Sequence, residues 1–61
     1  MPLTTTPNLP EHDTFYAELL DAHRGLSEAE SHALNARLVL ILANHVGDLE
    51  ALRAALALAK T

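Results

Sequence analysis

Cysteine is absent from the 61-residue chain, and glycine occurs only twice. The first absence excludes disulfides and thiolate metal sites together, and the second excludes a glycine-rich phosphate loop. A domain of this length buries roughly 60% of the surface that its unfolded chain exposes, so its core is marginal. The remaining ways to stabilise so small a fold are a metal site made of histidines or carboxylates, or association with a second chain.

Basic residues are scarce, with four Lys and Arg against eight Asp and Glu and a net charge of −4. Nucleic-acid binding draws much of its affinity from cations on phosphates, so we expect no nucleic acid and no anionic membrane among the partners. The longest apolar run, 38–43, is far shorter than the ~20 residues of a membrane span. The first ten residues have neither the basic start nor the apolar run of a signal peptide. We expect a cytoplasmic protein.

Three of the first ten residues are proline, and three consecutive threonines stand between them. Proline removes backbone donors and disfavours helix in the residue before it, so residues 1–12 are predicted to form an extended arm. Residues 13–61 are predicted to form one three-helix domain, with helices over 13–24, 28–46 and 49–60. The residues expected to start or stop these helices are Asp13, Gly25, Ser27, Glu30, Gly47 and Asp48.

Short turns between the three helices predict an all-α, three-helix antiparallel bundle. Residues 38–43 are apolar on every side of the helical wheel, so the central helix is expected to be the most buried element. The last helix adds an apolar half-wheel of Leu and Ala. Two short helices cannot wrap a third completely, and we therefore expect dimerisation to complete the bundle. The alternative is a compact bundle that hides these side chains by itself.

The predicted interface combines apolar and polar side chains of the second and third helices. Its members are Leu38, Leu40, Leu42, Leu52, Leu56, Arg37, Asn44 and His45. Polar groups set into an apolar helix need hydrogen-bond partners when buried. Arg37, Asn44 and His45 are thus either the polar anchor of an interface or donors to loop carbonyls within one chain.

Four histidines raise a metal hypothesis, and His23 and His45 lie within apolar stripes. The two end successive antiparallel helices, which places them roughly 20–25 Å apart, so one chain cannot bring them to a shared metal. We expect structural roles for both and no bound metal or cofactor. The alternative function is a histidine-based metal or small-ligand site formed at a dimer interface.

Catalysis and DNA binding are poorly supported by the residues present. Nucleophiles are confined to a few Ser, Thr and Tyr side chains, and Ser27 is already explained as a helix cap. We therefore predict a protein that is not an enzyme. A weak helix-turn-helix likeness around Ala43 and Gly47 leaves Arg53 as the main base-reading candidate, which makes DNA binding the less favoured alternative.

Several segments together resemble one family of short proteobacterial proteins that is catalogued as a domain of unknown function. They are Phe15-Tyr16, Ala22-His23, Gly25-Leu26-Ser27, Leu34-Asn35-Ala36-Arg37-Leu38 and Ala43-Asn44-His45-Val46-Gly47-Asp48-Leu49. The resemblance implies no activity. Members are similar in being encoded near flavin-dependent aromatic hydroxylases and other aromatic-catabolism enzymes, which implies an accessory role beside such an enzyme. The prediction is a non-catalytic interaction domain, either a homodimer or an accessory subunit of a larger protein.

Overall fold

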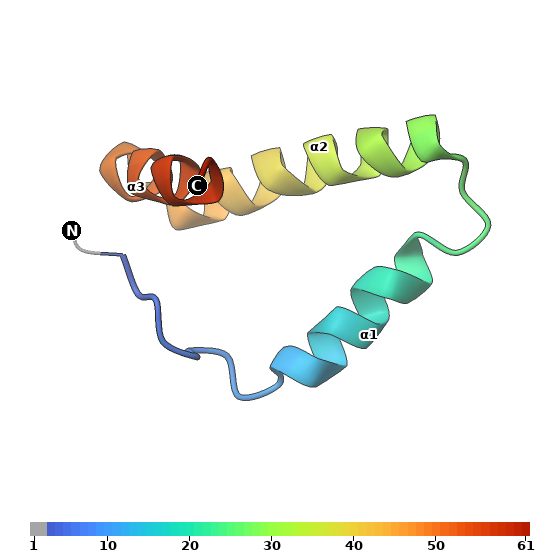
Figure 1. The fold of residues 1–61 in the computed structure, drawn as a ribbon, viewed down its shortest axis with the longest axis horizontal. Helices are drawn as coiled ribbons and strands as arrows, with labels where there is room; N and C mark the ends of the chain where they lie inside the picture. Colours follow the sequence, from blue (N-terminus) through green and yellow to red (C-terminus); the bar gives the residue numbers. More distant parts are fainter. Residues whose placement is uncertain (1–2) are drawn as a thin grey trace.

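The computed structural model describes residues 3–61 and folds them into three helices, with no strand in that range (Figure 1). The helices are α1 (His12–Ala22), α2 (Glu28–Val46) and α3 (Leu49–Ala59). The predicted all-α, three-helix class is confirmed. The predicted bounds of α2 coincide with the observed ones, and those of α1 and α3 differ by one or two residues. Residues 1 and 2 of the predicted arm lie outside the described residues.

Both ends of α2 are fixed by local hydrogen bonds. The Ser27 hydroxyl accepts from the Glu30 backbone N–H at 3.2 Å, and the Ser27 N–H donates to Glu30 Oε1 at 2.9 Å. These two bonds form the predicted capping box. At the other end Gly47 has a φ of +66° and donates its N–H to the Ala43 carbonyl, as a left-handed C-cap does.

The starts of α1 and α3 differ in their capping. Asp48 Oδ1 accepts from the backbone N–H groups of Glu50 and Ala51 at 3.0 and 3.3 Å, as predicted for the N-cap of α3. The N-cap position of α1 is Glu11, whose side chain makes no capping bond. The prediction that Asp13 caps this helix is wrong, because Asp13 already lies inside the first turn.

The end of α1 also comes earlier than predicted. The backbone N–H groups of His23 and Arg24 bond to carbonyls three residues back, those of Leu20 and Asp21. This tightening ends the regular helix at Ala22. Gly25 then takes the expected left-handed conformation, with a φ of +79°, inside the turn that follows.

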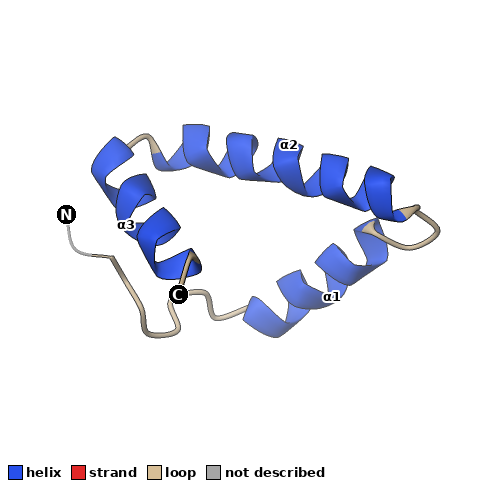
Figure 2. Cartoon of the chain, turned by 45° about the horizontal axis from the view of Figure 1, so that its top comes forward, coloured by secondary structure: helices blue, strands red, loops and turns tan. Residues whose placement is uncertain are grey.

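The three helices form an open arrangement. α1 and α2 run in opposite directions and diverge from their connecting turn, and α3 folds back from the far end of α2, so that the helices lie like the sides of a triangle (Figures 1 and 2). Among the described residues, α2 and α3 are the helices whose backbones approach one another. The Cα radius of gyration is 13.2 Å, against roughly 10.5 Å for a compact domain of this length.

No described residue is buried in the single chain. Leu40 and Ile41 of the central helix keep 70% and 64% of their surface exposed. The alternative of a bundle that hides these side chains by itself is therefore wrong. The prediction that α2 is the most buried helix does not hold within a single chain. Burial of α2 in a dimer or in a complex with another protein stays a prediction. No described helix has both the length and the hydropathy to cross a bilayer.

Candidate interaction surface

The angle between α2 and α3 holds an almost wholly apolar groove of about 440 Å³, here called the α2–α3 groove. Its lining residues are Val39, Ala43, Leu52, Ala55, Leu56 and Ala59. The α2 pair is spaced i, i+4, and the α3 residues are spaced 0, 3, 4 and 7. Each set therefore shares one side of its helix. The Gly47–Asp48 turn between the two helices makes both sides face the same groove.

Exposed apolar side chains continue beyond the groove along α2. Leu42 and Val46 are about half exposed, while Leu34 and Leu38 are partly covered on the side of the helix that also carries Ser31. Soluble monomers rarely expose contiguous apolar patches larger than a few hundred Å². The apolar surface of α2 and α3 is thus the candidate functional feature of the chain.

The predicted apolar interface residues fall into three places. Leu52 and Leu56 line the groove. Leu38 is half-buried, on the side of α2 that also carries Ser31 and Leu34. Leu40 and Leu42 are exposed and do not line the groove. That these five leucines belong to an interface stays a prediction.

The groove residues that sequence reasoning missed are mostly small. Val39 and Ala43 on α2 and Ala55 and Ala59 on α3 were not among the predicted interface positions. Their spacing along each helix was a signal that could have found them. Alanines, more than leucines, create the hollow between the two helices, because they make up half of the groove lining.

The polar side chains Arg37, Asn44 and His45 are exposed, and none donates to a loop carbonyl within residues 3–61. The intrachain alternative for these three is therefore not seen. Their role as the polar anchor of an interface stays a prediction. The expected hydrogen bond from His45 to a loop carbonyl is likewise absent from the described chain.

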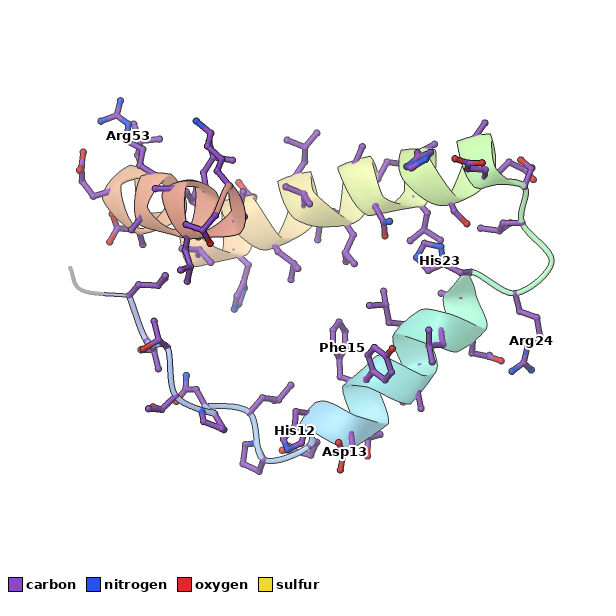
Figure 3. All side chains as sticks on the ribbon, viewed as in Figure 1. His12, Asp13, Phe15, His23, Arg24 and Arg53 are labelled. Atoms are coloured by element: carbon purple, nitrogen blue, oxygen red, sulfur yellow. The ribbon has the colours of Figure 1, made fainter. Side chains whose placement is uncertain are left out.

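A three-residue cluster joins the end of α1 to α2. His23 Nδ1 lies 2.9 Å from Ser31 Oγ, and His23 Nε2 lies 3.0 Å from Asn35 Oδ1. Ser31 and Asn35 are one helical turn apart, and His23 lies between the two helices (Figure 3). A neutral imidazole satisfies both contacts when Nε2 donates to Asn35 and the Ser31 hydroxyl donates to Nδ1. His23 makes this link within the described chain, with partners that could not be identified from sequence, and its structural role stays a prediction.

The remaining charged contacts are local and exposed. Arg24 pairs with Asp21 and Arg53 with Glu50, each at 2.9 Å and three residues apart. Exposed pairs of this kind contribute about 0.2–1 kcal/mol at most. No three His, Cys, Asp or Glu side chains between residues 3 and 61 gather in a group that could hold a metal ion. None of these charges lines the α2–α3 groove.

The fold and this surface define a small all-α domain with an unpartnered apolar groove. Residues 3–61 match the model of a family described as "Protein of unknown function (DUF2783)", and the chain belongs to that family. No curated protein and no solved structure matches the chain.

Proposed function

We propose that this chain is a non-catalytic association domain that works as a homodimer or as a small accessory subunit. One observation supports the proposal above the others: none of residues 3–61 is buried, while apolar side chains line a groove and extend along α2. Covering an exposed leucine contributes about 1.5–3 kcal/mol. A few such side chains on each copy are enough to decide whether so small a domain folds.

The direct test is the mass of the purified full chain in solution. Sedimentation equilibrium at micromolar concentration should give at least twice the 6.6 kDa of one chain. A folded species of 6.6 kDa across the whole concentration range would contradict self-association. It would leave the accessory-subunit form of the proposal to be tested separately.

The accessory form has its own test. The sequence resemblance suggests a flavin-dependent aromatic-catabolism enzyme as the larger protein, so a tagged chain should retain such an enzyme when both are co-expressed. The matched control is Leu56→Glu, which places a carboxylate in the groove. Equal retention by the control would show that the groove takes no part in the contact.

A further inference from the structure

Two apolar features stay largely exposed in the described part of the chain. One is the α2–α3 groove. The other is a face of α1 that holds Phe15, Tyr16, Leu19 and Leu20, and these include both aromatic residues of the protein. Phe15 and Tyr16 keep 43% and 61% of their surface exposed. Phe15 projects from α1 toward the space between the helices rather than against a neighbouring helix (Figure 3).

We propose that in the homodimer α1 of each copy lies in the α2–α3 groove of the other copy. This inference rests on the proposed self-association and names the occupant of the groove. The arrangement is reciprocal, because each chain offers one helix and one groove. Two identical contacts related by a two-fold axis therefore close the assembly.

The shapes of the two surfaces suit each other. Alanines make up half of the groove lining, so the groove is hollow, whereas α1 presents four bulky side chains. Bulky residues on one helix pack best against small residues on the facing one. α1 and α3 each contain 11 residues, about 16 Å of helix, so one can lie along the full length of the other.

The dimensions of the chain favour a second copy as the occupant. Its radius of gyration of 13.2 Å is close to the roughly 13.7 Å expected of a compact globule of 122 residues, twice this length. Its accessible surface is 5382 Å², against roughly 3,900 Å² for a compact protein of 6.6 kDa.

The difference in area, roughly 1,500 Å² per chain, includes the extended residues before α1. Two chains together therefore carry about 3,000 Å² of such excess surface, which falls within the 2,000–5,000 Å² that obligate homodimers bury. The surface available thus meets what a permanent, interlocked dimer needs.

The hydrogen bonds of His23 and the charges agree with this exchange. Because His23 is held by Ser31 and Asn35, the end of α1 is fixed while the rest of the helix projects from α2. α1 contains three carboxylates and no Lys or Arg. Arg53 and Lys60 each directly follow a groove residue, so both cations of α3 and its C-cap are adjacent in sequence to the lining that an acidic helix would contact.

Cysteine pairing tests the proposal cleanly, because the chain has no cysteine of its own. One batch carries Tyr16→Cys on the apolar face of α1, and a second, nitrogen-15-labelled batch carries Ala55→Cys in the groove. The two are mixed, exchanged through denaturant, refolded and mildly oxidised. We expect mass spectrometry to find a disulfide between position 16 of one chain and position 55 of the other as the main product.

The matched control replaces Tyr16→Cys with Thr14→Cys, on the opposite side of the same helix. It should give at least tenfold less mixed disulfide. Leu20→Cys, also on the apolar face, serves as a second probe should Tyr16→Cys prevent refolding, and is expected to cross-link to position 55 as well.

Three results would overturn the proposal. A native dimer that yields mainly 55–55 disulfides, or as much product with Thr14→Cys, would show a dimer without helix exchange and leave the proposed function intact. A chain carrying both Tyr16→Cys and Ala55→Cys that closes as a monomer at every concentration would place α1 in its own groove. A native mass of one chain for the unsubstituted protein would remove self-association itself.

Discussion

At the scale of single residues, the fold depends on hydrogen bonds made within a few positions along the chain. The capping box of Ser27 and Glu30, the Asp48 cap and the left-handed Gly47 together fix where α2 and α3 start and where α2 ends. Short helices are marginal in water by themselves. Since no described residue is buried, these local bonds carry an unusually large share of the order within one chain.

The capping box gives a pH-dependent prediction. The backbone N–H of Ser27, and then its side chain, hydrogen-bond to the Glu30 carboxylate and hold the pKa of Glu30 below its ordinary value of 4.5. A carboxyl whose folded pKa is depressed stabilises the fold above its unfolded pKa, and this contribution is lost as the pH falls through the depressed value. We therefore expect helicity of the first turn of α2 to weaken below about pH 4.5, in step with Glu30 protonation.

Carbon-13 NMR of the Glu30 carboxyl group measures this titration directly. Ser27→Ala keeps the backbone N–H bond and removes the smaller cause, the side-chain bond, so it should return the pKa of Glu30 only part of the way toward its ordinary value. It should also destabilise the helix by about 1 kcal/mol through loss of the cap. Ser27→Asp retains a capping oxygen and should recover most of that loss. A wild-type titration midpoint at the ordinary value would contradict the prediction.

At the scale of the elements, the parts that could be predicted from sequence are those set by local signals. The bounds of α2 follow from the Ser27–Glu30 spacing and from Gly47, both of which act within one turn. The end of α1 could not be placed in this way. Gly25 takes the expected conformation, but the tighter bonding of His23 and Arg24 ends the helix before it.

The groove lay beyond sequence reasoning for a different reason. Hydrophobic periodicity identifies the apolar sides of α2 and α3 but not the angle at which the two helices meet, which the Gly47–Asp48 turn sets. That angle places Val39 and Ala43 in the groove lining and leaves Leu40 outside it. The link from His23 to Ser31 and Asn35 depends in the same way on the path of a turn.

Leu56→Glu separates association from the local order of α3. Leu56 is already 60% exposed in the single chain and lines the groove, so a glutamate there should cost the isolated helix little. In a symmetric dimer the change occurs twice and removes at least ~3 kcal/mol, which corresponds to at least a hundredfold weaker dimer.

Sedimentation velocity over a dilution series measures the change in dimer affinity caused by Leu56→Glu. Glu18→Lys is the control, because it alters an exposed charge on the polar side of α1 and should shift the dissociation constant less than threefold. A Leu56→Glu protein that dimerises as tightly as the unsubstituted chain would show that the groove is not an interface.

At the scale of the whole molecule, the proposed self-association makes folding and association one process. A domain stabilised by only 5–15 kcal/mol depends on what it buries, and this chain buries no described residue by itself. Under the proposed self-association, most of the favourable free energy comes from contacts between chains. Such proteins have no stability that is independent of protomer concentration.

The melting temperature should therefore rise with protein concentration. A tenfold increase in concentration adds about 1.4 kcal/mol to the stability of a dimer. The entropy of unfolding 122 residues is about 0.26 kcal/mol/K, at about 2.1 cal/mol/K per residue. The ratio predicts a rise of about 5 °C for each tenfold step, measurable by circular dichroism between about 1 and 100 µM. Leu56→Glu should melt at a lower temperature than the unsubstituted chain throughout this range, because a smaller fraction of its chains is dimeric. A midpoint that does not move over the hundredfold range would mean that the single chain is stable alone, and the open arrangement of its helices would then need a source of stability other than a second copy.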